Sequence, residues 1–213
     1  MKNVFLAGTK VCLRPLDRAD APLFVEWVND PQVTRTLLLY RPMTLEAEEE
    51  FLTNVTKSDK DIVLGIVARD SDALIGIAGL HQIDFKDRHA AFGIFIGEVS
   101  EWAKGYCTEA TSLMVQYAFE TLNLHRVWLH VLEHNTGGIA SYLKVGFQQE
   151  GLLRESFFRE GEYHNTIAMG LLRDEWRARR AVGDDGSAAV GSPAQKAGTK
   201  KRSRLFRSFL TRG

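Results

Sequence analysis

The sequence predicts a mixed α/β fold, and three observations lead to that prediction. An apolar run at residues 90–97 is followed by a short loop with one glycine and then by a helical pattern of apolar residues. A second apolar run, at residues 126–132, is also followed by a helical pattern. Earlier in the chain, two strand-like runs are joined by a short polar turn. Such alternation of strands, turns and helices indicates helices packed on a sheet.

The first half of the chain contains two predicted helices and three predicted strands. Thr44 suits the N-cap of the second helix, because its hydroxyl can accept a hydrogen bond from a backbone N–H group of the first turn. The polar turn Asp70-Ser71-Asp72 separates the two strands of a hairpin. The expected elements are a strand at 11–16, helices at 18–28 and 45–56, and hairpin strands at 62–69 and 74–83.

In the second half, residues 90–97 are almost entirely β-branched, aromatic or small, which indicates a strand buried on both faces. Residues 126–132 form the next expected strand, and a helix is expected to begin near Asn135. Thr108 and Glu109 suit the start of the helix that lies between these strands. Its apolar positions recur at helical spacing: Ala110, Leu113, Met114, Tyr117, Ala118 and Leu122.

The stretch from Glu101 to Ala110 connects a strand to a helix N-terminus, where several unpaired backbone N–H groups point to one place. A diphosphate has the charge and the acceptor atoms to bind there. Gly105 would let such a ligand approach the backbone closely. One glycine and one lysine also occur in ordinary strand-to-helix turns, so this loop alone does not separate the two interpretations.

Taken with the downstream sequence, this loop resembles that of the GNAT superfamily of acyl-CoA-dependent N-acyltransferases. The family pattern is Arg or Gln, two residues, Gly, one residue, then Gly or Ala. It falls on residues 102–107, where Gly105 is kept and Trp102 and Cys107 depart from it. One branch, containing the ribosomal-protein alanine N-acetyltransferases and the spermidine acetyltransferases, often has Trp-Gly-Lys-Gly-Tyr-Gly-Thr-Glu-Ala here. Only Ala103 and Cys107 differ from that version, and residues 146–176 resemble the same branch.

The resemblance covers residues 10–178 and implies a GNAT-type fold, with a central, mostly antiparallel sheet in which two neighbouring strands splay. It also implies acetyl-CoA as the acyl-donor cosubstrate, bound in the gap between those strands, and no metal. The backbone of the strand is expected to hold the pantetheine arm, and the loop is expected to hold the diphosphate. The residues concerned are Ile94, Phe95 and Ile96 on the strand, and Trp102, Ala103, Lys104, Gly105, Tyr106, Cys107 and Thr108 in the loop.

Two further positions match functional residues of the family. Asn135 matches the residue that hydrogen-bonds the cofactor arm, and Tyr142 matches the catalytic Tyr that protonates the coenzyme A thiolate. Seven residues are two helical turns, so both side chains would share one face. From the residues alone, Asn135 could simply cap this helix and Tyr142 could be a core aromatic. Gly137 and Gly138 cost about 1 kcal/mol each relative to Ala in a helix, so they loosen it or make room for a ligand.

The resemblance also implies a primary amine as the acceptor, and the class of amine is less well specified. A Lys side-chain amine has a pKa of about 10.4, whereas an α-amine has a pKa of about 7.7–8.0, so the α-amine is much more often neutral at pH 7. This difference and the branch resemblance favour a peptide or protein N-terminal amine. Many relatives place a Glu where this chain has Phe92, and Gly79 and His81 beside it supply no carboxylate, which weakens a polyamine interpretation.

Several residues are candidates for the base or for substrate contacts, and each has a plain structural alternative. His81, Asp84, Asp87 and His89 could act as bases or proton relays, or could be solvated residues of loops and strand ends. Glu26, Trp27, Asn29 and Asp30 lie where the substrate-facing helix of the family ends, and they could equally form a helix C-terminus stopped by Pro31.

The composition is that of an ordinary globular protein, with 45% hydrophobic and 25% charged residues among 213. The two cysteines, Cys12 and Cys107, show no disulfide pattern, which favours a reducing cytoplasm. Neither a secretory signal nor an apolar span near 18 residues is evident. At a helix start Cys107 could have a depressed pKa and react with thiol reagents, or could simply replace a small residue.

The composition changes after residue 180. We expect an N-acetyltransferase domain at 1–180, a flexible linker at 181–199 and a basic amphipathic tail at 200–213. After residue 180 there are seven Lys or Arg and two Asp, a net charge of +5, which leaves residues 1–180 at −5 in a neutral chain. The tail could contact an anionic membrane or RNA, recruit a partner, or have no function. The oligomeric state stays open, with a homodimer as one option.

The leading function is therefore a cytoplasmic N-acetyltransferase that joins acetyl-CoA and an amine by direct attack in a ternary complex. One alternative is an acetyltransferase for a small-molecule amine, such as an amino sugar, an antibiotic or a polyamine. Another is an acetyl-CoA-binding regulatory module without turnover, suggested by the departures at Phe92, Trp102 and Cys107.

Overall fold

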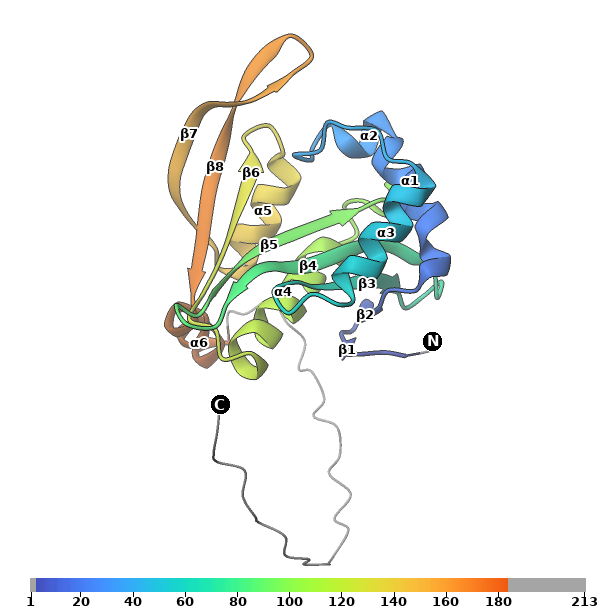
Figure 1. The fold of residues 1–213 in the computed structure, drawn as a ribbon. Coiled ribbons are helices and arrows are strands. Elements are labelled where there is room, and N and C mark those ends of the chain that lie inside the picture. Colours follow the sequence, from blue (N-terminus) through green and yellow to red (C-terminus); the bar gives the residue numbers. More distant parts are fainter. Residues whose placement is uncertain (1–2, 184–213) are drawn as a thin grey trace, which may run out of the picture.

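The structure is a computed structural model that describes residues 3–183, and its centre is a single eight-stranded sheet (Figure 1). The strand order is β1-β2-β3-β4-β5-β6-β8-β7, and every neighbouring pair is antiparallel except β5 and β6. The predicted mixed α/β fold with a mostly antiparallel sheet is confirmed. The strands are β1 Leu6–Ala7, β2 Val11–Pro15, β3 Ile62–Ala68, β4 Leu74–Asp84, β5 His89–Ile96, β6 Arg126–Leu132, β7 Gln148–Arg159 and β8 Glu162–Leu172.

Helices cover both faces of this sheet. Helices α1 (Ala21–Asn29) and α3 (Leu45–Val55) pack Phe24, Trp27 and Leu52 against one face, with the short helix α2 (Pro31–Thr34) between them in the chain. Helix α4 (Tyr106–Gln116) packs on the other face, in the main core. Helices α5 (Thr136–Val145) and α6 (Arg173–Val182) complete the described chain, in which no helix is long and apolar enough to cross a membrane.

The helix predicted at 18–28 is divided in two. A 3₁₀ turn, η1 (Arg18–Asp20), comes first, and Asp17 caps it by accepting the Ala19 N–H group at 2.9 Å. Helix α1 begins at Ala21 and has Pro22 in its first turn, where the missing N–H group of proline costs no hydrogen bond. A second 3₁₀ turn, η2 (Val99–Glu101), follows β5, and a π-helical turn, η3 (Tyr117–Thr121), extends α4.

Strand β5 differs from the prediction of burial on both faces. Its residues alternate between buried and half-buried at the start and are half-buried from Gly93 to Ile96. The cause is the splay that the family resemblance implied, and this expectation is confirmed. β5 and β6 are paired only between His89–Ala91 and Arg126–Trp128, whereas β5 stays paired with β4 as far as Ile96. Beyond Ala91, no strand in the described part of the chain pairs with β5 on its β6 side.

One carboxylate fastens the start of the chain to α4. Glu109 accepts hydrogen bonds from the backbone N–H groups of Thr9 at 2.8 Å and of Lys10 and Val11 at 2.7 Å, and also from the Thr9 hydroxyl. Burial alone would raise the pKa of Glu109, but these hydrogen bonds hold it below its usual value. The residues just before β2 are therefore fixed beside the predicted diphosphate loop.

The last described helix runs slightly past the boundary predicted at residue 180. Helix α6 ends at Val182, and Gly183 follows it with φ of 77°, the left-handed conformation that commonly ends helices at glycine. Residues 181 and 182 therefore belong to the helix rather than to the predicted linker. Residues 184–199 of that linker and the basic tail at 200–213 lie outside the described residues.

Candidate active site

Two cavities meet in the gap between β5 and β6. The first, here called the sheet cavity, has a volume of about 450 Å³ and lies between strands β4–β6, helices α1 and α3, and the segment at 36–39. The second, here called the loop cavity, has a volume of about 320 Å³ and lies between the end of β5, the loop at 101–107 and helix α5. The residues that line both are Thr36, Leu37, Ile94, Phe95, Asn135 and Tyr142.

The first turn of α4 forms one end of the loop cavity. Gly105 is its N-cap residue, with φ of 87°, a conformation that favours glycine, and no side chain caps this turn. The first backbone N–H groups of α4 are thus left for another acceptor. A helix N-terminus without a side-chain cap attracts anions, and the diphosphate of a coenzyme A ester suits this end of the cavity.

The residues predicted to bind the cofactor are mostly brought together in the loop cavity. All of them line it except Lys104, whose Nζ donates to Glu101 at 2.9 Å, and Thr108, which lies further along α4. Sequence reasoning had not assigned some of the lining, including Glu101 and Ser141. Gly137 and Gly138 also line the cavity. The sequence signal for them was that two glycines destabilise the start of a helix, which suggested that they make room for a ligand.

The two departures from the family loop have clear structural roles. The Trp102 indole N–H donates to the Ile96 carbonyl oxygen at 2.9 Å, so this side chain folds back over the end of β5. Cys107 lies in the lining, where burial raises the pKa of its thiol. The possibility of a depressed Cys107 pKa is therefore wrong, because desolvation of the thiolate prevails at this helix start. Cys107 serves here as a small residue.

Asn135 and Tyr142 share one face of α5, as their spacing predicted, and both line both cavities. The Asn135 Oδ1 accepts the Gly138 N–H group at 2.9 Å and so caps α5, while its Nδ2 donates to the Thr36 carbonyl oxygen at 3.3 Å. A Cβ atom at Gly138 would lie 2.8 Å from that Nδ2, so any larger residue there would make the Asn135 side chain shift. Asn135 therefore fulfils the capping alternative and also faces the cavities.

Tyr142 is 7% exposed, and its ring packs edge-on against Phe92 and Phe147. Burial raises the pKa of its hydroxyl far above the usual value, so the group stays protonated at neutral pH. Both earlier interpretations of Tyr142 are thus compatible, because a core aromatic here also presents its protonated side chain at the junction of the cavities.

A segment at residues 34–39, here called the roof, lies over that junction and is held through its backbone. Arg159, at the end of β7, donates to the carbonyl oxygens of Thr34 at 2.6 Å and Leu37 at 3.0 Å, and also to that of Leu39. The guanidinium lies 4.9 Å from the centre of the Phe157 ring. Together with the Asn135 contact to Thr36, these bonds join the roof to β7 and α5.

The sheet cavity is mainly apolar and contains few ionisable groups. Of the described lining residues, those that titrate are Glu48, His81, His130 and Tyr142. Glu48 is only 4% exposed, and burial raises the pKa of its carboxyl group. Phe92 packs in the core, while Ala91 and Gly93, its neighbours on β5, alternate to the face that holds His81 and Gly79. Phe92 also lines the sheet cavity, so this position, where many family members have a Glu, supplies no carboxylate there.

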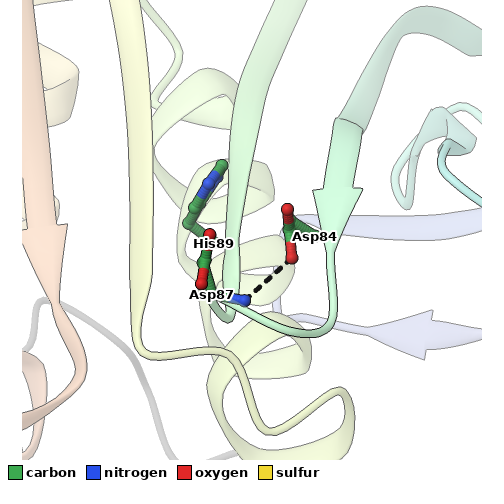
Figure 2. Close-up of side chains that lie close together, drawn as sticks. All are labelled: Asp84, Asp87 and His89. Atoms are coloured by element: carbon green, nitrogen blue, oxygen red, sulfur yellow. Dashed lines mark hydrogen bonds between the residues drawn. The ribbon is translucent and has the colours of Figure 1, made fainter.

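Three of the four candidate bases lie away from both cavities. Figure 2 shows Asp84, Asp87 and His89 at the turn between β4 and β5. Their potential ligand atoms lie within 4.8 Å of one another, but Asp84 Oδ1 accepts the backbone N–H groups of Lys86 and Asp87 at 2.8 Å and so caps the turn. These three residues are therefore residues of a turn and of strand ends, and His81 is the one candidate base of the four that lines the sheet cavity.

The residues expected at the substrate-facing helix also have structural roles. Trp27 is 4% exposed in the second core cluster, and the Asn29 side chain bonds both backbone groups of Met43. Asp30 caps α2 by accepting the Gln32 N–H group at 2.8 Å. Glu26 is exposed and, like the other three, does not line either cavity; Phe24 and Val28 of the same helix line the sheet cavity instead.

Comparison with known proteins agrees with this geometry. The family model described as an acetyltransferase (GNAT) domain matches residues 10–148. The chain belongs to the GNAT family. It is thus an acetyl-CoA-dependent N-acetyltransferase that acts on an amine acceptor, as the resemblance implied. The alternative of an acetyl-CoA-binding module without turnover is therefore wrong.

Relatives of this GNAT protein include enzymes with different acceptors in their names. The spermidine N(1)-acetyltransferase of Escherichia coli K12 is 32% identical over 168 residues, which cover 79% of this chain and 89% of that protein. A putative ribosomal N-acetyltransferase of Bacillus subtilis is 32% identical over 108 residues, or 51% of this chain and 58% of that protein. The crystal structure of Vibrio cholerae spermidine N-acetyltransferase with CoA and spermine has a TM-score of 0.74 and 26% identity, covering 79% and 98% of the two chains.

Proposed function

We propose that the loop cavity binds acetyl-CoA and that the sheet cavity binds the acceptor amine. The diphosphate would accept hydrogen bonds from the N–H groups at the start of α4, and the pantetheine arm would lie along the unpaired edge of β5 at Ile94–Ile96. The observation that carries this proposal is the meeting of the two cavities at Tyr142 and Asn135. The protonated Tyr142 hydroxyl would then give its proton to the departing thiolate.

The acceptor that suits the sheet cavity best is a primary amine on an apolar body, such as the α-amine of a peptide with an apolar first residue. Two observations support this class. The described lining is mostly apolar, with Glu48 as its one carboxylate. An α-amine is also neutral far more often at pH 7 than an aliphatic amine, so less free energy is needed to deprotonate it.

A polyamine is the second candidate, and a specific observation favours it. Glu48 is buried beside an apolar cavity, where an ionised carboxylate is costly unless a cation pairs with it. A second ammonium group of the acceptor could supply that cation. The relatives named for spermidine make this class worth testing.

A coenzyme A release assay with matched acceptors tests the proposed class. We expect kcat/KM for a peptide with an N-terminal Leu or Phe to exceed that for spermidine by about tenfold or more, because each apolar group placed in the pocket contributes about 1–3 kcal/mol. The control is a peptide of the same sequence with a Lys added and its α-amine acetylated, so that the Lys side chain offers the one free amine. A preference for spermidine over every peptide would reject the first candidate and support the second.

Replacing Glu48 by Gln separates the two candidates by a different route. If the carboxylate pairs with a second ammonium group, kcat/KM for spermidine falls about tenfold or more, because a hydrogen bond to a charged group contributes about 1.5–3 kcal/mol. Turnover of an uncharged apolar peptide should change little, since Gln keeps the size of the side chain. Glu46→Gln, an exposed position on the same helix, is the matched control. Equal losses for both acceptors would contradict an acceptor-pairing role for Glu48.

A further inference from the structure

His81 and Asp61 form a hydrogen-bonded pair at the wall of the sheet cavity. The His81 Nδ1 lies 3.1 Å from Asp61 Oδ1, and Asp61 also accepts a hydrogen bond from the Ser58 hydroxyl at 2.6 Å. Burial alone would raise the pKa of Asp61, but the hydrogen bonds from Ser58 and His81 hold it below its usual value. An ionised Asp61 can only accept, so it selects the imidazole tautomer with the proton on Nδ1.

The other ring nitrogen, Nε2, lies over a bare part of the sheet. Gly79 and Gly93 face each other in the β4–β5 register, and neither has a side chain to cover this area. A Cβ atom at Gly79 would lie 2.6 Å from His81 Nε2, and one at Gly93 would lie 3.6 Å from it. Both glycines and His81 line the cavity. The basic lone pair of Nε2 is therefore on the cavity side, with no hydrogen-bond partner among the described residues.

The other titratable groups that line the cavity are less suited to accept a proton. Glu48, from α3, has no hydrogen-bond partner among the described residues to orient it, and its burial favours the protonated form. Tyr142, from α5, is a proton donor for the same reason. His130, from β6, is exposed and packs on Trp128. β5 contributes no titratable side chain beside His81, because Ala91 and Gly93 occupy its facing positions.

We propose that His81 is the general base of the reaction and that Asp61 is its positioning residue. This inference rests on the proposed assignment of the sheet cavity to the acceptor. His81 Nε2 takes one proton from the acceptor ammonium and passes it to solvent. The amine nitrogen then forms its bond to the thioester carbonyl carbon as the carbon–sulfur bond breaks. Tyr142 gives its proton to the sulfur and regains one from the nitrogen, so the nitrogen loses two protons in total and coenzyme A gains one.

The first test is a His81→Ala variant assayed over a range of pH. We expect kcat/KM for the acceptor to fall 10²–10⁴-fold, as for loss of a general base, with the affinity for acetyl-CoA unchanged by calorimetry. The wild-type fall in rate toward acid pH should disappear, and added imidazole should restore part of the rate. The loss should be smaller for acceptors whose amine pKa lies below the assay pH. His125→Ala, at an exposed position outside both cavities, is the matched control.

Two further measurements separate this inference from its alternatives. Asp61→Asn should lower kcat and shift the acid limb of the pH profile while leaving that limb present, as expected for a positioning residue. Nitrogen NMR of the full chain should show His81 with its proton on Nδ1, whether or not a good acceptor has been found. A proton on Nε2, or an unchanged pH profile in His81→Ala, would overturn the inference. If the wild type releases no coenzyme A with any acceptor while His81 carries its proton on Nδ1, the result would instead count against the proposed acceptor class.

Discussion

Replacing Tyr142 by Phe is expected to lower kcat by 10²–10⁴-fold while leaving the affinity for acetyl-CoA nearly unchanged. The ring of Tyr142 packs against Phe92 and Phe147, and Phe keeps those contacts. Only the hydroxyl is lost, and with it the proposed proton donor for the thiolate. A loss of this size is typical when one general acid is removed. Steady-state coenzyme A release and calorimetric titration with acetyl-CoA measure the two quantities separately.

Tyr117→Phe is the matched control, because Tyr117 makes the same kind of aromatic contact with Phe5 but lies outside both cavities. Its turnover should equal that of the wild type. Wild-type kcat in Tyr142→Phe would show that another group protonates the sulfur, and loss of acetyl-CoA affinity would show that the hydroxyl serves in binding instead.

Replacing Glu109 by Gln is expected to lower the free energy of unfolding by about 2–4 kcal/mol. The carboxylate accepts three backbone N–H groups, from Thr9, Lys10 and Val11, and hydrogen bonds to a charged group are worth about 1.5–3 kcal/mol. Gln offers one oxygen and turns its NH₂ group toward donors. Urea unfolding at pH 7 measures this difference. Glu50→Gln, an exposed change on α3, should differ from the wild type by less than about 0.5 kcal/mol.

The effect of Glu109 should depend on pH in a defined direction. Its pKa in the folded protein lies below the ordinary value, so its contribution is complete above about pH 4.3, the usual Glu pKa. That contribution is lost as the pH falls through the lower pKa of the folded state. The gap between wild type and Glu109→Gln should therefore narrow in acid. A gap that widens on acidification would contradict the hydrogen-bonding account.

Much of the fold follows from local sequence. The strand at 126–132 was predicted with its observed bounds, and the Thr44 cap is present, because apolar runs and capping residues act over a few positions. The start of the helix predicted at residue 18 was misplaced, because the side chain of Asp20 bonds Arg14 and the Asp17 N–H group ahead of the helix. The half-exposed face of β5 could not be foreseen from its own residues, since it depends on where β6 diverges.

The candidate site also has parts that the sequence predicts and parts that it does not. The loop around Gly105 and the pair Asn135 and Tyr142 were recognisable because their spacing is fixed along the chain. The contact of His81 with Asp61 joins β4 to the residue just before β3, and Arg159 binds the roof from more than 100 positions away. Only the paired register and the packing of the hairpin formed by β7 and β8 bring such groups together, and single-sequence periodicity does not encode either.

The attachment of the roof also bears on how acceptor preference can diverge among related chains. Arg159 and Asn135 hold residues 34–39 solely through main-chain oxygens, which every amino acid possesses. Mutations at Leu38 or Leu39, which line the sheet cavity but not the loop cavity, can therefore change the shape of the sheet cavity while the anchoring bonds persist. Most of the lining of the loop cavity, including the starts of α4 and α5, lies on other elements and need not change with them. Related chains could therefore keep the same acetyl-transfer reaction and still differ in the acceptors that they use.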